Sequence, residues 1–191
     1  MNEIDKLPEV TLRALEPEDL ELLYHIENDD KLWNVGISNV PYSRFMLHDY
    51  IANSSGDIYT DKQVRLMIVD SNNTCVGIID IVDFNPQHRR AEIGIVIMSE
   101  YRNRGFAKAA LSKAISYCHR VIHLAQIYAI IQNDNKISIN LFNSLGFSAL
   151  ILLLCLLFDG EKYNDAVLMQ FFLLLLHQPS CHETNVNNLV L

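Results

Sequence analysis

The stretch that decides the fold is Ser99-Glu100-Tyr101-Arg102-Asn103-Arg104-Gly105-Phe106-Ala107-Lys108. An apolar run at residues 91–98 precedes it, and this run predicts a strand that is buried on both faces. Apolar residues follow it at helical spacing from Phe106 to about residue 121. We therefore expect a buried strand that passes through a glycine-containing turn directly into a helix.

This turn has the properties of an anion site. Consecutive backbone N–H groups at a helix N-terminus, together with the positive end of the helix dipole, suit a phosphate or pyrophosphate. Gly105 lets the backbone approach a ligand, and Arg102, Arg104 and Lys108 add positive charge. An ordinary basic surface loop is the alternative that the turn alone leaves open.

Further elements are predicted on both sides of the turn. Residues 10–15, 64–69, 75–83, 125–131, 147–157 and 163–174 read as strands, and helices are expected from residues 17, 41 and 135. This order indicates an α+β fold with a mostly antiparallel sheet in one domain, residues 1–176. The polar residues 177–191 are expected to form a poorly ordered tail.

Composition narrows the function. The formal net charge of −8 argues against nucleic acid as the main partner, because phosphate backbones bind basic surfaces. The longest apolar run, 149–158, is far shorter than the ~20 residues that span a bilayer, so no membrane partner is expected. The four cysteines are widely spaced and the histidines lack ligand spacing, so we expect reduced thiols and no metal. The N-terminus lacks the features of a signal peptide, which predicts a cytoplasmic protein.

The segments around the turn resemble a known family. Arg102-x-x-Gly105-x-Ala107 matches the pyrophosphate-loop signature of the GCN5-related N-acetyltransferase (GNAT) superfamily. Asn135 to Phe147, with Ser138 and a Leu-Gly-Phe ending, is similar to the family helix that flanks the arm of coenzyme A. Residues 85–92, which end in Arg89-Arg90-Ala91-Glu92, resemble the spermidine and ribosomal-protein N-terminal acetyltransferases within it.

The resemblance implies a twisted sheet of six to seven strands, about four flanking helices and a splayed central strand pair. It also implies acetyl-CoA as co-substrate, with pantetheine amides pairing with the backbone of the opened strand. The cofactor-binding residues implied in this way are Ile95, Val96, Ile97, Arg102, Asn103, Arg104, Gly105, Phe106, Ala107, Lys108, Asn135, Ser138 and Phe142.

Acetyl transfer to an amine needs a proton acceptor. A lysine-like amine with a pKa of ~10.4 is neutral in only about one molecule in 2500 at pH 7. Glu92, on the strand beside the thioester, is the first candidate base. Asp80 and Asp83 lie three residues apart on the preceding strand, where alternation would point them to opposite faces. Asp83 is the one expected in the pocket.

The proton donor to the leaving thiolate departs from the family pattern. Spermidine acetyltransferases typically carry a tyrosine where this chain has Phe142, and phenylalanine has no proton to give. Tyr163 is the catalytic residue that we predict instead, and Tyr128, Ser138 and water are the alternatives.

The acceptor expected from the resemblance is a polyamine or diamine such as spermidine. Protein N-terminal amines, amino sugars or antibiotics, and a regulatory role with little turnover remain alternatives. Residues 36–42 hold none of the glutamates that grip polyamines in the family, and Glu27, Asp29 and Asp30 are possible substitutes. The apolar strands near 150–157 and 167–176 predict either packing against another subunit or a two-sided core.

Overall fold

A computed structural model describes residues 7–29 and 41–173 of the chain. In these residues seven strands form one sheet in the order β1-β2-β3-β4-β5-β7-β6. The strands are β1 (Val10–Ala14), β2 (Val64–Asp70), β3 (Cys75–Asn85), β4 (Arg90–Ile97), β5 (Gln126–Gln132), β6 (Ser148–Phe158) and β7 (Tyr163–Phe172). Every neighbouring pair is antiparallel except β4 and β5, which are parallel. The predicted α+β fold with a mostly antiparallel sheet is confirmed.

Five α-helices and two short 3-10 helices accompany the sheet in the described residues. They are η1 (Pro17–Asp19), α1 (Leu20–Glu27), α3 (Arg44–Asn53), α4 (Ile58–Asp61), η2 (Ser99–Tyr101), α5 (Phe106–Arg120) and α6 (Lys136–Ser144). Side chains cap several of them: Ser43 accepts from the Met46 amide at α3, and Asp57 accepts from the Tyr59 and Thr60 amides at α4.

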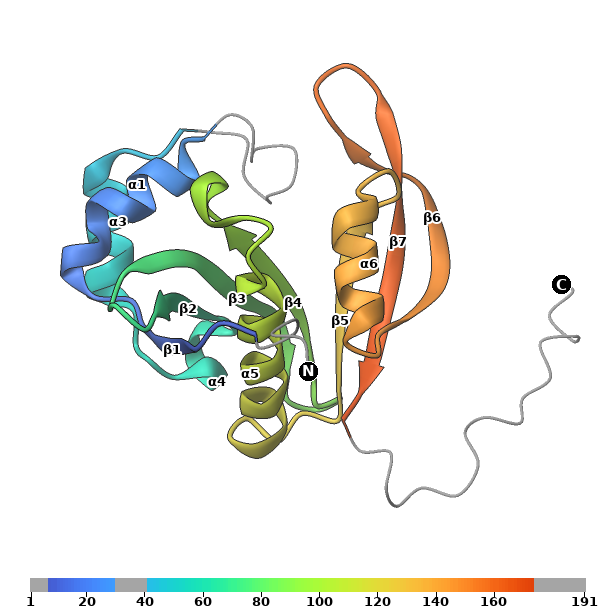
Figure 1. The fold of residues 1–191 in the computed structure, drawn as a ribbon, viewed down its shortest axis with the longest axis horizontal. Coiled ribbons are helices and arrows are strands. Elements are labelled where there is room, and N and C mark those ends of the chain that lie inside the picture. The colour runs from blue at the N-terminus through green and yellow to red at the C-terminus, as the bar shows by residue number, and fades with distance from the viewer. Residues whose placement is uncertain (1–6, 30–40, 174–191) are drawn as a thin grey trace, which may run out of the picture.

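Helices cover both faces of the sheet (Figure 1). The larger core lies under α5 and α6, where Ile79, Ile93 and Ile127 of the sheet pack with Ala110 and Phe142 of the helices. A smaller cluster on the other face joins Ile26 of α1 to Met67 and Ile78. The strands therefore have a helix-covered apolar face and a second face that is only partly covered by α1 and α3.

Two predictions change in detail, and the short helix α4 has no counterpart among the predicted elements. The helix expected from residue 41 begins at Arg44, after the capping Ser43. The strand at 91–98 is not buried on both faces, because Ala91, Ile93 and Ile97 are buried while Glu92, Gly94 and Val96 are half-buried. The tail 177–191 and the stretch that contains Asp30 and residues 36–40 lie outside the described residues.

Candidate active site

The sheet opens between its two parallel strands. β4 and β5 pair only at Arg90–Gln126, Ala91–Ile127 and Glu92–Tyr128. Beyond Glu92, β4 continues to Ile97 alongside β3, and β5 continues to Gln132 alongside β7. The two strands thus diverge after Glu92 and Tyr128, as Figure 1 shows between the green and yellow strands. The expected splayed strand pair is present.

The opened edge of β4 presents alternate backbone groups. The Met98 amide donates to the Val76 carbonyl at 3.0 Å, which sets the phase of the antiparallel β3–β4 ladder. Gly94 and Val96 therefore turn their backbone groups to β3, whereas Ile95 and Ile97 turn theirs toward the opening. The backbone contacts predicted for Ile95 and Ile97 fit this geometry. Val96 can offer only its side chain.

The turn after β4 forms as the sequence predicts. η2 leads into an exposed segment in which Asn103 (φ 60°) and Gly105 (φ 82°) are left-handed, and Gly105 is the N-cap of α5. The first amides of α5, those of Phe106, Ala107 and Lys108, precede the first possible intrahelical bond, which the Ala109 amide makes to Gly105. These amides have no intrahelical acceptor, which is the arrangement that an anion site at a helix N-terminus requires.

The two arginines of this turn have protein contacts of their own. Arg102 donates from Nε to the Ile97 carbonyl at 2.9 Å, at the opened edge of β4. The Arg104 guanidinium carbon lies 5.8 Å from the centre of the Tyr101 ring. Both side chains belong to exposed residues, so their remaining donors face solvent at the mouth of the opening.

Packing within the protein is a further reason for a glycine at position 105. A Cβ at this position would lie 3.0 Å from Cδ of Pro8 and 3.5 Å from Cδ2 of Leu7. The positive φ also disfavours any residue with a side chain. The glycine thus allows the turn to pack against the segment that precedes β1.

The predicted residues of α6 have mainly structural contacts. Asn135 is the N-cap, and its Oδ1 accepts from the Ser138 amide at 3.1 Å. Phe142 is only 3% exposed, and its ring packs edge-on against Phe147 with centroids 4.9 Å apart. A buried ring of this kind offers little surface to a cofactor, so the cofactor contact predicted for Phe142 does not fit its burial.

At the closed end of the opening, the polar side chains of Asp83, Glu92 and Tyr128 come together. Register places Val82, Glu92 and Tyr128 side by side on β3, β4 and β5, on the face covered by α1. The Tyr128 hydroxyl donates to Oδ2 of Asp83, the residue after Val82. The structure therefore brings together Glu92 and Asp83, two of the predicted catalytic residues, and adds Tyr128.

The predicted opposite orientation of Asp80 and Asp83 is wrong. The ladder between β3 and β4 is irregular from Val82 to Asn85, and Asp83 has a φ of 50°. An extra residue in one strand of a pair breaks the alternation of side chains. This bulge brings Asp83 to the face of Asp80 and Glu92, and no rule of strict alternation could show it.

Burial and charge tune the cluster. Burial is the main cause that raises the pKa of Glu92, and the nearby Asp83 raises it further. A hydrogen bond with the Ile130 backbone lowers it. Burial, followed by the hydrogen bond to Asp83, raises the pKa of Tyr128. Glu92 is therefore a better base than an ordinary glutamate, and Tyr128 stays a hydroxyl donor.

Tyr163 lies apart from this cluster. It begins β7 at the β6–β7 hairpin, whereas Gln170, near the other end of β7, is level with Tyr128. Its side chain is 66% exposed and stacks on Phe158 with centroids 5.0 Å apart. The structure does not bring this predicted catalytic residue to Glu92 and Asp83.

A largely buried arginine on the same face has no counterpart among the predicted site residues. Arg65 of β2 donates to Asp80 at 2.6 Å and to Glu27, at the end of α1, at 2.5 Å. All three side chains are largely buried. The only signal was that Arg65 and Asp80 stand among apolar residues in their strands, which does not identify partners. Asp80 and Glu27 are thus engaged by Arg65 next to the site.

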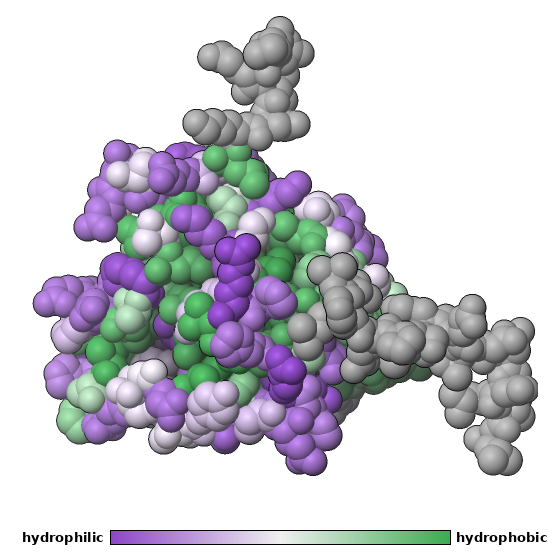
Figure 2. Space-filling model, turned by 90° about the horizontal axis from the view of Figure 1, so that it is seen from below, coloured by the Kyte–Doolittle hydropathy of each residue, from purple (hydrophilic) through white to green (hydrophobic). Residues whose placement is uncertain are grey.

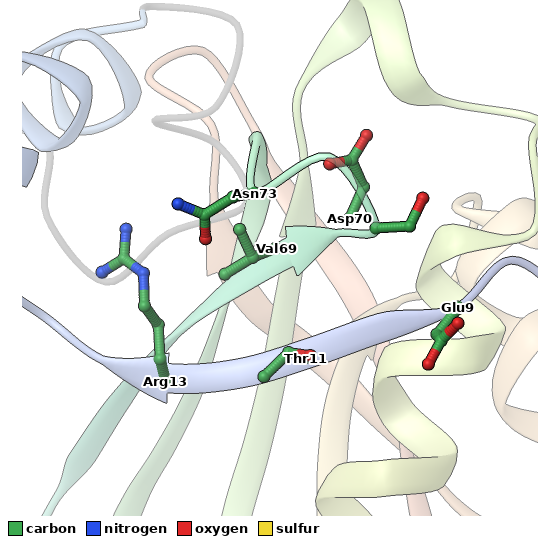
Figure 3. A pocket seen from close by; sticks show the side chains of 7 residues that line it. Glu9, Thr11, Arg13, Val69, Asp70 and Asn73 are labelled. Carbon is green, nitrogen blue, oxygen red and sulfur yellow. The ribbon is translucent and has the colours of Figure 1, made fainter.

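A shallow depression lies elsewhere, on the β1 edge of the sheet (Figure 3). It is lined by Glu9, Thr11 and Arg13 of the β1 segment and by Val69, Asp70, Ser71 and Asn73 around the β2–β3 turn. Arg13 is bound to Asp19 at 2.6 Å, and three strands separate this edge from the opening. Within residues 7–29 and 41–173, no group of His, Cys, Asp or Glu side chains is arranged to hold a metal ion.

Comparison with known proteins agrees with this geometry. Residues 9–148 match the model of the acetyltransferase (GNAT) domain. The chain therefore belongs to the GNAT acetyltransferase family, whose enzymes transfer an acetyl group from acetyl-CoA to an amine. No helix of the described residues is long and apolar enough to cross a membrane.

Named relatives point to one branch of this family. The chain is 30% identical to the spermidine N(1)-acetyltransferase of Escherichia coli K12, over 85% of this chain and 86% of that protein. The crystal structure of spermidine N-acetyltransferase from Vibrio cholerae with CoA and spermine is 26% identical, with a TM-score of 0.76 over 85% of this chain and 95% of that one. A dodecameric structure of the Vibrio cholerae enzyme is 27% identical, with a TM-score of 0.72 over 86% and 94% of the two chains.

Proposed function

We propose that this protein transfers the acetyl group of acetyl-CoA to a primary amine of a polyamine such as spermidine. The observation that carries the proposal is the opening between β4 and β5, with an anion-binding turn at its mouth and two carboxylates at its closed end. The similarity to spermidine acetyltransferases over 85% of the chain supports the choice of amine.

The chain offers a match for the pyrophosphate, the pantetheine arm and the thioester of acetyl-CoA. The first amides of α5, with Arg102, Arg104 and Lys108 around them, suit the pyrophosphate. The backbone groups of Ile95 and Ile97 suit the amides of the pantetheine arm. Acetyl-CoA supplies the activated acetyl group, so the thioester is expected near Glu92, where the opening closes.

The carboxylates act on the amine. The charges of Asp83 and Glu92 attract the ammonium group of a polyamine and hold it on the α1 side of the sheet. Glu92 then accepts the proton that the amine must lose, directly or through one water. The C–N bond forms as the C–S bond of the thioester breaks, and the thiolate takes a proton. The thiolate of an alkyl thiol with a pKa of ~8.5 can take this proton from water at modest cost.

The experiment is an amine panel in which free thiol release from acetyl-CoA is measured. We expect spermidine and spermine to give the highest kcat/KM, above N-terminal peptides and amino sugars. Tight CoA binding with no amine-dependent thiol release across the panel would contradict the proposal and leave a CoA-binding regulatory protein. If a peptide N-terminus reacts and spermidine does not, the polyamine is wrong as the acceptor, but acetyl transfer from acetyl-CoA to an amine is supported.

We also infer that the protein works as a homo-oligomer in the cytoplasm. β6 is an edge strand, and its apolar side chains are exposed on both faces, with Leu154 70%, Phe158 59% and Ile151 55% exposed. Such a strand is covered in stable proteins, and a second copy of the chain is the natural occupant. The Vibrio cholerae relative forms a dodecamer, which supports self-association. The free thiols of Cys75 and Cys118 suit a reducing compartment.

A further inference from the structure

We propose that Tyr128 is a positioning residue of the transfer site, because its hydroxyl spans the closed end of the opening and holds the Asp83 carboxylate beside Glu92. This inference rests on the proposed function, since it concerns how the two carboxylates meet the amine. It assigns to Tyr128 a role that acts through Asp83 and not through the leaving thiol.

The geometry follows from three neighbouring strands. Tyr128 is the last residue of β5 that is level with β4, and its partner Glu92 is in turn level with Val82 of β3. The tyrosine side chain therefore reaches from β5 across the row of Glu92 to the bulge on β3, where its hydroxyl meets Oδ2 of Asp83. Only a long side chain with a terminal donor can connect the outer strands of this row.

Asp83 needs such a connection. It is an exposed residue with a φ of 50°, at the irregular end of the β3–β4 ladder. An exposed carboxylate normally samples several rotamers in water, and ordering it costs conformational entropy. The charge-assisted hydrogen bond from Tyr128 selects the rotamer that faces Glu92.

The neighbouring charges keep Tyr128 in this role. Burial, Asp83 and Glu92 all raise the pKa of the phenol, and Arg90 of β4 acts in the opposite direction. The hydroxyl therefore stays protonated throughout the working pH range. Asp80, the next carboxylate along the face, is already bound to Arg65 at 2.6 Å, so Asp83 is the carboxylate left to act on Glu92 from β3.

A double-mutant cycle tests the coupling. Tyr128→Phe, Asp83→Asn and the double variant are compared in kcat/KM for spermidine, with thermal melting to check folding. We expect each single change to lower kcat/KM about tenfold and the double change to lower it no further, as for residues that act as one unit. Losses that multiply to about a hundredfold in the double variant would overturn the proposal, because they would show that Tyr128 acts independently of Asp83.

A measurement without turnover separates this inference from the proposed function. The Glu92 carboxyl is titrated by carbon-13 NMR in the substrate-free protein and in Tyr128→Phe, with Tyr59→Phe as a control that removes a hydroxyl from a 58% exposed tyrosine of α4. We expect the pKa of Glu92 to fall in Tyr128→Phe, because Asp83 turns away, and to stay unchanged in Tyr59→Phe. An unchanged Glu92 pKa in Tyr128→Phe would overturn the inference. The expected shift in a protein that acetylates no amine would sink the proposed function alone.

Discussion

Glu92 combines two properties at the scale of the single residue, because it is half-buried and lies beside a second carboxylate. Both raise its pKa, burial more than Asp83. A base is most useful when its pKa lies near the working pH, so the same environment that makes ionised Glu92 unfavourable also makes it effective. This residue is where stability and activity are expected to conflict.

Replacing Glu92 with Gln should lower kcat with spermidine by about 10²- to 10³-fold, because the proton acceptor is lost. In the wild type, kcat/KM should rise with pH through the raised pKa of Glu92. The variant should lose this limb of the pH–rate profile, and an unchanged profile would remove Glu92 from the mechanism.

The same variant should be more heat-stable than the wild type at pH 8. The folded-state pKa of Glu92 is raised, so its ionised form opposes folding at every pH above that pKa. Below the unfolded value of ~4.3 the group is protonated in both states, and the penalty is absent. The difference in Tm between Glu92→Gln and wild type should therefore be positive at pH 8 and vanish at pH 4. A difference independent of pH would show that packing is its cause.

At the scale of the element, the turn before α5 depends on one glycine. Gly105→Ala should lower stability by ~1–2 kcal/mol, because a side chain is strained at φ 82° and its Cβ would meet Pro8. It should also raise KM for acetyl-CoA, since the first amides of α5 move with the turn. Gly160→Ala is the control: its φ is 100° and nothing lies within 4 Å of the new Cβ, so it should lose stability but leave KM unchanged. Equal KM values in both variants would contradict the role of the turn.

The second feature at this scale is Arg65, whose ion pairs with Glu27 and Asp80 connect α1 to the sheet. Arg65→Met should cost ~3–5 kcal/mol of unfolding free energy, because it leaves the largely buried carboxylates of Asp80 and Glu27 without the arginine. Arg44→Met is the matched control, since its pair with Glu21 has side chains 52% and 60% exposed and should cost less than ~1 kcal/mol. Urea denaturation of both variants measures the difference, and similar costs would contradict the burial argument.

These elements also show how far the sequence could predict the structure. The turn from Arg102 to Ala107 was predicted because glycine placement and periodicity are local properties. The succession of strands and helices along the chain followed from the same patterns, and the splayed strand pair followed from the resemblance. The bulge at Asp83 and the bonds of Arg65 could not be predicted, because they arise between strands that are distant in the chain. Tyr163 was a candidate because it has a hydroxyl, and only the register of β7 shows that it lies far along the hairpin.

At the scale of the whole molecule, hydrophobic residues reach the surface in several places. Figure 2 shows them interspersed with hydrophilic ones on the face seen from below. The largest sequence-continuous group among the described residues is on β6, from Leu150 to Phe158. Residues 154–156 bulge out of the ladder with β7, and the Cys155 amide donates to Oδ1 of Asp165 at 2.9 Å. This combination is the basis for the proposed oligomer.

Leu154→Lys should therefore lower the mass measured by light scattering after size-exclusion chromatography. A charge on the edge strand opposes its burial against a second copy. Val121→Lys, which changes a 61% exposed apolar residue at the end of α5, should leave the mass unchanged. A wild-type protein that runs as a monomer at all concentrations would contradict the oligomer itself.

The opening between β4 and β5 has a further consequence for the rates at which backbone protons exchange with deuterium. Along β4, the amides of Gly94 and Val96 face β3, whereas those of Ile95 and Ile97 face the opening. Neighbouring residues of one strand should therefore exchange at alternating rates in the ligand-free protein, with Ile95 and Ile97 fast. Among the amides of β4, CoA should slow only these two. The exchange rates of the Ile95 and Ile97 amides would therefore report whether CoA occupies the site, without any assay of acetyl transfer.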